Sequence, residues 1–251
     1  MPSRNEIVDY CNTLLRVDDF EDYCPNGLQL EGKSEIKTIV GGVSACIELF
    51  EKAKEISADM ILVHHGIIWY GSQPVFTGSY GLRIKLLIDS EINLAAYHLP
   101  LDGHLEIGNA AVLANKLGLR DITPAFKKNG QFVGIAAKSE DISLDDFQRK
   151  WFKISERDPL IFPFGPDKIK RVMIATGGAQ KDISEALSAG ADLFITGEVN
   201  EQSMHIAKEE KIHFVSAGHH ETEKFGILAL GDLLQKQFKI DFHFIDIHNP
   251  V

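Results

Sequence analysis

The segment KTIVGG at residues 37–42, followed by a helix-like stretch and then by ADMILV at residues 58–63, decides the fold. The same order returns as KRVMIATGG at residues 170–178, with ADLFIT at residues 191–196 after it. Short apolar runs that alternate with helical patterns are typical of sheets covered by helices. The repetition therefore predicts an α/β protein made of two pseudo-equivalent α/β halves, each with a helix-covered sheet.

The rest of the chain continues this alternation. We expect strands at residues 37–43, 59–63, 92–97, 171–175, 192–196, 212–216 and 240–247, and helices at residues 46–56, 82–90, 109–117, 183–189, 201–210 and 223–238. Ser3 and Glu6 form a capping box for a further helix at the N-terminus. We expect a first α/β half at residues 1–120, a proline-containing crossover segment at 121–166 and a second half at 167–251.

Potential metal ligands follow several of the expected strands. His98-x-x-x-Asp102 recurs as His219-x-x-x-Glu223, and each copy follows an apolar run. His64-His65 ends a third such run. Imidazole nitrogens and carboxylate oxygens at strand ends are what a divalent metal ion requires, and ligands of α/β sheets bind at the carboxyl ends of strands. The pattern predicts a two-metal site in a cleft between the two halves.

The local sequence indicates how these side chains are presented. His64 and His65 point to opposite faces of a strand, so they can reach two neighbouring ions. Pro100 predicts a loop between His98 and Asp102. Thr222 is expected to cap a helix with Glu223 in its first turn, and a glutamate there can bridge ions about 3.5–4 Å apart.

Each of these residues also has a simpler interpretation when it is taken alone. His64 and His65 could be a hydrogen-bonded core pair, His98 a structural histidine, and Asp102 a turn residue. Only the combination of several strand ends favours a metal site. Glu198 aligns with His65 between the two halves, and we expect it to line the same cleft.

Composition narrows the function classes. The 251 residues carry a net charge of −10, which disfavours a general nucleic-acid-binding surface but leaves a local basic groove open. Apolar runs are too short for a membrane span and no secretion signal is visible, so we expect a cytoplasmic protein. The three cysteines form no C-x-x-C motif and suit reduced thiols.

Two glycine pairs follow expected strands and precede expected helices. Gly41-Gly42 and Gly177-Gly178 suit either phosphate binding or tight strand-to-helix turns.

Several segments together resemble the dinuclear metal-centre proteins known as GTP cyclohydrolase I type 2 homologues, the Nif-three-like family. The matching segments are Asn26-Gly27-Leu28-Gln29-Leu30, His64-His65-Gly66, Tyr97-His98-Leu99-Pro100-Leu101-Asp102, Thr196-Gly197-Glu198 and Gly218-His219-His220-Glu221-Thr222-Glu223. The resemblance spans essentially the whole chain and implies the short bacterial form, without an inserted middle domain. Leu99-Pro100-Leu101 departs from the more polar sequence that many members have there.

The resemblance also implies a ligand set and an assembly. It places the metal ligands at His64, His65, Asp102, His219 and Glu223, with Glu223 as the bridge. It makes His98 a proton carrier or weaker ligand, and it implies a ring-shaped homohexamer, a toroid. Two divalent metal ions per subunit are expected, and ligands without thiolate suit Zn, Fe, Mn or Ni.

Two functions follow as expectations. The first is a metal-dependent hydrolase in which a metal-bridged hydroxide attacks a small-molecule substrate while His98 or Glu198 moves protons. By resemblance the substrate is a nucleotide, GTP, although a phosphoesterase or amidohydrolase would use the same chemistry. The alternative is a non-catalytic metal-binding ring that docks other proteins or nucleic acid, in stress response or DNA repair.

Overall fold

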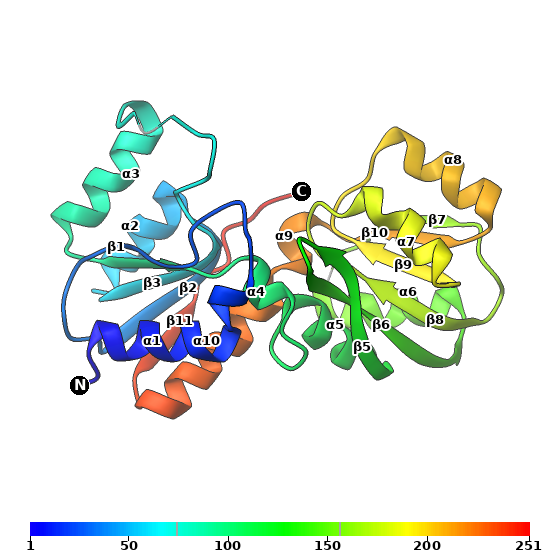
Figure 1. Cartoon of the computed structure of the whole chain (residues 1–251), viewed down its shortest axis with the longest axis horizontal. Helices are drawn as coiled ribbons and strands as arrows, with labels where there is room; N and C mark the ends of the chain where they lie inside the picture. Colours follow the sequence, from blue (N-terminus) through cyan, green and yellow to red (C-terminus); the bar gives the residue numbers. More distant parts are fainter. Residues whose placement is uncertain (74, 156) are drawn as a thin grey trace. The chain divides into compact units, whose positions relative to one another are not determined.

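The chain forms two compact units, each an α/β structure with its own sheet and helices, as the sequence predicts (Figure 1). The computed structural model describes residues 1–73, 75–155 and 157–251. Unit 1 comprises Met1–Leu101 and Gly226–His248, and unit 2 comprises Asp102–Phe225 and Asn249–Val251.

In unit 1 the described residues form a five-stranded sheet in the order β1-β4-β3-β2-β11. All neighbouring strands are parallel except β1, which runs antiparallel to β4. The strands are β1 Gly27–Leu30, β2 Thr38–Ser44, β3 Met60–His65, β4 Asn93–Ala96 and β11 Asp241–Phe244. The helices are α1 Arg4–Leu15, η1 Val17–Asp19, α2 Ile47–Glu55, α3 Gly78–Asp89, most of α4 Leu99–Asp102 and most of α10 Lys224–Phe238.

The final strand belongs to unit 1, whereas the sequence places it in a second half at residues 167–251. β11 pairs in parallel with β2, with Asp241 opposite Thr38. Phe242 packs over Gly41, where a Cβ atom would lie 2.6 Å from its ring. The chain thus returns to the first sheet after unit 2. There β11 pairs with backbone N–H and C=O groups of β2 that would otherwise be exposed at the edge of the sheet.

In unit 2 the described residues form a six-stranded sheet in the order β5-β6-β8-β9-β10-β7, with β8, β9 and β10 parallel. The strands are β5 Arg120–Lys128, β6 Gln131–Ile142, β7 Leu160–Pro163, β8 Ile169–Ile174, β9 Leu193–Thr196 and β10 His213–Ser216. The helices are α5 Asn109–Leu117, α6 Leu144–Ser155, η2 Gln180–Asp182, α7 Ile183–Ser188, α8 Glu201–Glu210 and α9 His219–Thr222.

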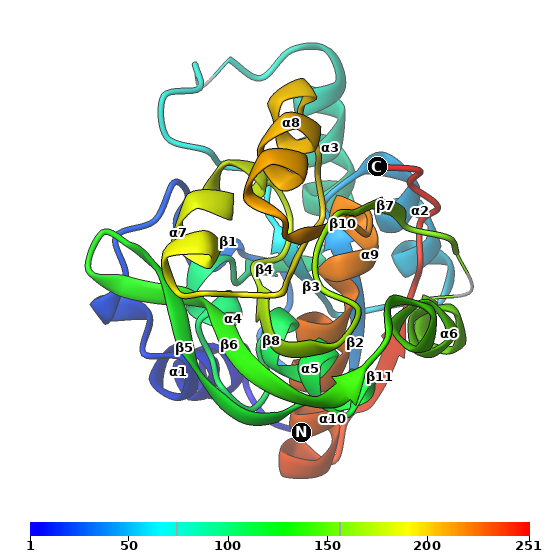
Figure 2. The same ribbon diagram turned by 90° about the vertical axis from the view of Figure 1, so that its right-hand side faces the viewer.

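Residues 121–166, expected as a crossover, supply strands to this sheet. β5 and β6 form a long hairpin, drawn as a green ribbon in Figure 2. Asn129 and Gly130 join them with φ values of 45° and 91°, the positive values that a two-residue hairpin turn requires. An Asn-Gly pair is typical of such turns, but the expectation of a crossover segment did not take it into account.

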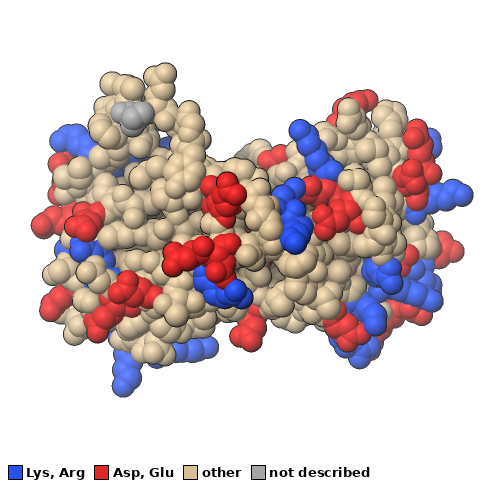
Figure 3. Space-filling view, in the orientation of Figure 1, with Lys and Arg blue, Asp and Glu red and all other residues tan. Residues whose placement is uncertain are grey.

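The surface is of mixed charge. On the face shown in Figure 3, acidic and basic side chains are interspersed over both units. Within the part of the chain that the structure describes, no helix is long and apolar enough to cross a membrane. The three cysteines, all among the described residues, are unpaired, as the sequence suggests, and Cys11 and Cys24 are buried.

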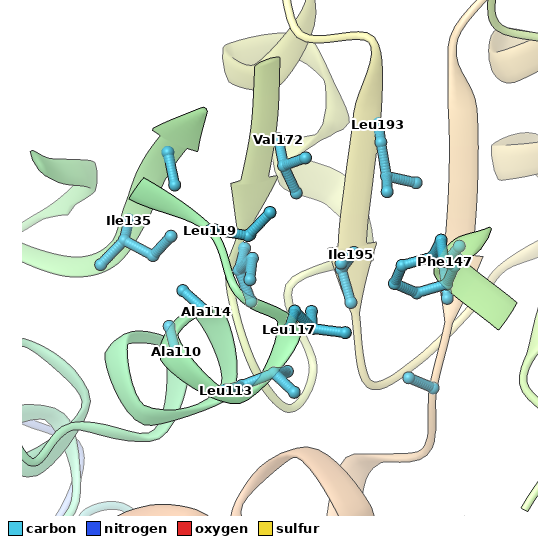
Figure 4. Close-up of a cluster of buried hydrophobic side chains, with 14 of the residues drawn as sticks. Ala110, Leu113, Ala114, Leu117, Leu119, Ile135, Phe147, Val172, Leu193 and Ile195 are labelled. Carbon is cyan, nitrogen blue, oxygen red and sulfur yellow. The ribbon is translucent and has the colours of Figure 1, made fainter. Parts of the chain in front are cut away.

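Alternate residues of the parallel strands in unit 2 face two different cores. Val172, Leu193 and Ile195 pack against α5 and against Phe147 of α6, a cluster seen in Figure 4. Their neighbours Met173 and Phe194 pack on the other face, against α7 and α8. Because these strands are covered on both faces, they appear in the sequence as continuous apolar runs.

The glycine pair Gly41-Gly42 lies inside β2 rather than in a turn. A Cβ at Gly41 would meet Phe242 and Ile227 of α10, whereas one at Gly42 would lie 2.6 Å from Leu49 of α2. The pair therefore allows a helix to approach each face of the sheet closely. Neither phosphate binding nor a strand-to-helix turn is needed to explain it.

Equivalent aspartates fix the start of the repeated strands. Asp59 Oδ2 accepts hydrogen bonds from Lys37 N at 2.8 Å and Thr38 N at 3.0 Å. Asp192 Oδ2 accepts the same pair of bonds from Lys170 N and Arg171 N, at 2.8 and 2.9 Å. These aspartates support the predicted structural repeat, because each satisfies amides at the start of the preceding strand.

The strand registers show that the two His-x-x-x-acid patterns do not occupy equivalent positions in the repeat. Met60 of β3 pairs with Asn93, and Leu193 of β9 pairs with His213. Counting from these pairs, Gly218 rather than His219 occupies the position of His98. The two His-x-x-x-acid patterns are therefore offset by one residue.

We predict that Asp59→Ala lowers the free energy of unfolding at neutral pH by about 1–3 kcal/mol, because two backbone amides lose their acceptor. Burial by itself raises the pKa of Asp59, but the bonds from Lys33 and the two amides outweigh it and hold the pKa below its ordinary value of 3.8. The charged form therefore stabilises the fold above about pH 4, and this contribution is lost as the pH falls through the lowered pKa.

Urea unfolding followed by circular dichroism measures this difference across pH. The gap between wild type and Asp59→Ala should be constant from about pH 7 to 5 and narrow below about pH 4. Asp18→Ala, at an exposed aspartate of the same unit, is the control and should change little. An equally small effect of Asp59→Ala would contradict the anchoring role.

Candidate metal centre

Unit 1 gathers three histidines at the carboxyl end of its sheet. His64 and His65 end β3, and His98 follows the neighbouring parallel strand β4. The ring centroid of His64 lies 4.8 Å from that of His65 and 5.0 Å from that of His98. Each ring offers a nitrogen within 4.8 Å of the others, so these predicted residues form a group that could hold a metal ion.

Two of the three rings are oriented through Nδ1 by neighbouring strands. His64 Nδ1 lies 2.9 Å from the backbone oxygen of Tyr97. Because a carbonyl only accepts, Nδ1 carries the hydrogen, and in the neutral ring Nε2 then bears the lone pair. His65 Nδ1 lies 2.9 Å from Ser44 Oγ, a hydroxyl that can donate or accept. His64 is fully buried, which fixes its ring in place.

His98 is held by residues that sequence reasoning missed. Its Nδ1 lies 2.8 Å from Asp22 Oδ1, and its backbone amide donates to Asn26 Oδ1 at 2.7 Å. Asn26 lies in a segment that carries the family resemblance, but Asp22 stands in a stretch with several acidic residues and has no motif of its own. Nothing in the sequence singled it out.

The loop after β3 packs aromatic residues against the histidines. Gln29 Oε1 accepts a bond from Ile67 N at 2.8 Å, and a Cβ at Gly66 would clash with the Gln29 amide. Trp69 then lies edge-on to His98, with ring centroids 5.3 Å apart. Gly66 is therefore required for the close approach of Gln29, which ties down the start of this loop.

Asp102 lies at the end of a helical turn, not in the loop expected from Pro100. Proline at position 100 falls in the first turn of α4, where a missing amide hydrogen costs no helical bond. Asp102 is buried, and its Oδ1 accepts bonds from Asn109 Nδ2 at 2.8 Å and Thr176 Oγ1 at 3.2 Å. Thr176 lies two residues after the end of β8.

In unit 2, His219 is the first residue of the short helix α9, and Glu223 directly follows its last residue. The sequence expectation that Thr222 caps a helix with Glu223 in its first turn is wrong. Thr222 is the last residue of α9, and its hydroxyl donates to His219 O and accepts from Gly177 N. Glu223 follows α9 and precedes α10. The Thr222 hydroxyl is engaged by His219 and Gly177, so the expected cap is not formed and the long helix begins at Lys224.

The His219 ring lies between two carboxylates. Nδ1 is 2.7 Å from Glu198 Oε1, and Nε2 is 3.0 Å from Glu223 Oε2. Burial by itself lowers the pKa of His219, but the bonds and charges of Glu223 and Glu198 outweigh burial and raise the pKa to about 9. Unit 2 thus brings together three predicted residues, with Glu198 positioned to orient His219.

Gly177 leaves the space that this group needs. Its φ is +62°, a conformation that favours glycine. A Cβ there would clash with Glu223 Oε1 and lie 3.0 Å from His219 Nε2. Its carbonyl accepts the amides of Gly197 and Glu198, so it also holds the segment that carries Glu198.

We predict that Gly177→Ala separates His219 from Glu223. In the metal-free protein the pKa of His219 should fall from about 9 toward its ordinary value of 6.5, because the carboxylate that stabilises the imidazolium is displaced. Histidine NMR titration measures the shift. Gly178→Ala is the matched control, because a Cβ there lies no closer than 3.6 Å to Glu198 and makes ordinary contact. A folded Gly177→Ala protein with an unchanged His219 titration would show that the space at Gly177 does not hold His219 beside Glu223.

Two buried cysteines have thiols with raised pKa values. Cys24 lies in a group with Asp22 and His98, but burial, reinforced by the charge of Asp22, raises the pKa of its thiol to about 12. Burial likewise raises the pKa of Cys11 to about 12. Both are therefore neutral thiols near neutral pH in the metal-free protein.

Known proteins resemble the chain over its full length. It matches the family described as Duf34/NIF3 (NGG1p interacting factor 3) over residues 2–250. It is 45% identical to the GTP cyclohydrolase 1 type 2 homolog of Haemophilus influenzae over 98% of each chain. The protein of the same name from Pseudomonas aeruginosa is 43% identical over 97% of each chain. The chain therefore belongs to the Duf34/NIF3 family, which confirms the resemblance found in its motifs.

Solved structures agree with this assignment. Protein ybgI, described as of unknown function, matches with a TM-score of 0.94 and 38% identity over 100% of both chains. TTHA1606 from Thermus thermophilus matches with a TM-score of 0.92 and 33% identity, again over 100% of both chains. These likenesses confirm the predicted fold class.

Proposed function

We propose that the chain binds two divalent metal ions and acts as a metal-dependent hydrolase. The proposed ligands are His64, His65, Asp102, His219 and Glu223. The orientation of the imidazoles carries the proposal: Nδ1 of His64 faces a carbonyl and Nδ1 of His219 faces a carboxylate. Metal-binding histidines characteristically donate their second N–H to such an acceptor, which directs the other nitrogen to the ion.

The contact between His219 and Glu223 in unit 2 gives a second, separate argument for a bound cation. His219 Nε2 and Glu223 Oε2 lie 3.0 Å apart, and Gly177 has no side chain where a Cβ would clash with Glu223. A nitrogen and a carboxylate oxygen held side by side require a proton or a metal ion between them. The backbone at Gly177 preserves that space.

The donor chemistry limits the metal. The proposed set contains only imidazole nitrogens and carboxylate oxygens. Mixed N/O ligands of this kind suit Zn, Fe, Mn or Ni.

Bound divalent ions would lower the pKa of water and so supply a nucleophile near neutral pH. Within the chain, we assign His98 the role of accepting and returning a proton at Nε2, since its Nδ1 is committed to Asp22. Glu198 holds His219 Nδ1 and receives a bond from Gln180 Nε2 at 3.1 Å. We therefore propose that Glu198 mainly orients His219, with proton transfer as a second role.

The names of the relatives support GTP as the substrate to test first. Proteins 45% and 43% identical to this chain are each called GTP cyclohydrolase 1 type 2 homolog. In the corresponding reaction one water adds to C8 of guanine and opens the imidazole ring, and a second water releases formate. The proposed site would provide the activated water for both steps.

We predict that purified protein binds about two divalent ions per chain. His64→Ala and Glu223→Ala should each lower the metal content measured by plasma mass spectrometry, because each removes a ligand. His205→Ala is the matched control, since His205 is exposed on α8 and pairs only with Glu201 in the described contacts. Full metal occupancy in both ligand variants would contradict the proposed set.

We further predict metal-dependent formate release from GTP. Chelation should abolish it, re-addition of the metal should restore it, and Glu223→Ala should lose at least about 10²-fold in kcat, because one of the proposed metal ligands is lost. Formate is quantified by a coupled formate dehydrogenase assay. Turnover that persists after complete metal removal would contradict a metal-dependent mechanism.

The alternative is a non-catalytic metal-binding protein that docks partners. The family description, NGG1p interacting factor 3, names an interaction rather than a reaction. Intact metal binding without turnover of GTP or of a nucleotide and amide panel would favour this role. The net charge of −10 favours a protein partner over nucleic acid.

We also propose that the chain assembles into a homo-oligomer, a hexamer by family resemblance. Tyr70 is 68% exposed, Phe76 65% and Leu82 58%, all in α3 or the segment before it. Large apolar side chains gathered in one segment support a contact with further subunits.

A further inference from the structure

Asp22 is a buried carboxylate with bonds both to its own segment and to the segment around His98. Its side chain is 2% exposed. Oδ1 lies 2.8 Å from His98 Nδ1 and also accepts from Tyr23 N. Oδ2 accepts from Leu99 N at 2.9 Å and from Asn26 Nδ2 at 2.8 Å. Such a set fixes both carboxylate oxygens in space.

These partners make the carboxylate an acceptor. The two backbone amides and the Asn26 amide group can only donate at these contacts, and a carboxylate that receives several N–H bonds stays ionised. Burial by itself raises the pKa of Asp22, but the bond and charge of His98, with the bonds from Asn26 and Tyr23, outweigh it and lower the pKa. An ionised carboxylate has no hydrogen to give, so the hydrogen in the contact with His98 belongs to Nδ1.

The rest of the His98 environment keeps the ring in that orientation. The backbone amide of His98 donates to Asn26 Oδ1 at 2.7 Å, so Asn26 links the carboxylate and the histidine backbone. Trp69 lies edge-on to the ring at 5.3 Å, and His64 packs against it at 5.0 Å. The ring therefore has little freedom to turn.

We propose that Asp22 is a positioning residue that holds His98 in the Nδ1–H tautomer, so that Nε2 bears the lone pair on a ring packed against His64 and His65. The tautomer is a property of the folded chain alone. Its consequence for proton transfer rests on the proposed function, because only a reaction at this site makes Nε2 of His98 useful.

The variant Asp22→Asn removes the negative charge of the side chain but keeps its size and shape. Two donors, Leu99 N and Asn26 Nδ2, face the Oδ2 position, whereas only Tyr23 N and the histidine face Oδ1. The amide oxygen should therefore take the Oδ2 position and the amide NH₂ should face His98. Nδ1 must then accept, and the hydrogen moves to Nε2.

The test is the tautomer of His98 by ¹⁵N NMR of the metal-free protein at about pH 8.5, above the ordinary histidine pKa of about 6.5. The His98 signal is assigned by its loss in His98→Gln. We expect Nδ1–H in wild type and Nε2–H in Asp22→Asn. In metal-loaded protein with GTP as probe, Asp22→Asn should lower kcat by about 10²–10⁴-fold with little change in KM or metal content.

Asp59→Asn is the matched control, since Asp59 is another aspartate of unit 1 that accepts two backbone amides on one oxygen, at the opposite end of β3. It should leave the His98 tautomer and kcat unchanged. Wild-type His98 with a hydrogen on Nε2, in either the neutral or the doubly protonated ring, overturns the proposal, and this result does not depend on whether Asp22→Asn folds. An unchanged tautomer in Asp22→Asn overturns it as well. Absence of GTP turnover in wild type, with the expected tautomers, refutes the proposed function and leaves the role of Asp22 standing.

Discussion

Parallel pairing of neighbouring strands is the constraint on which the candidate site depends. β3 and β4 end together, so His64, His65 and His98 are brought within contact of one another although they are distant in sequence. In unit 2, β8, β9 and β10 end together and place Gly177 beside Glu198 and His219. The anchors at Asp59 and Asp192 fix the opposite ends of these strands. A change of register by one residue would turn every one of these side chains to another face.

Acceptors that face Nδ1 determine which nitrogen of each histidine carries the hydrogen. The acceptor is a backbone carbonyl for His64 and a carboxylate for both His98 and His219. Each acceptor lies in a different segment, so the tautomers depend on tertiary structure and not on local sequence. This arrangement links the fold to the proposed metal chemistry, because the same acceptors that satisfy buried imidazoles also direct the remaining nitrogen.

Much of the fold could be predicted because the parallel strands are buried on both faces. β3 and β9 appear as unbroken apolar runs, and helices α5 and α8 begin and end where their patterns predict. The β5–β6 hairpin and the return of β11 to the first sheet were not predicted. Periodicity reports which residues are buried but not which strand they pair with, and Asn129-Gly130 was the one local signal that would have revealed the hairpin.

The sequence by itself determined the family, the α/β class and the histidines and acids that follow strands. These features depend on the order of neighbouring residues, because the burial pattern and the residue types are local properties of the chain. Tertiary structure alone decided that Asp22 holds His98, that Thr222 bonds to Gly177, and that Gly177 must lack a side chain beside Glu223. These contacts join segments far apart in sequence, and no local pattern encodes a partner that only folding supplies.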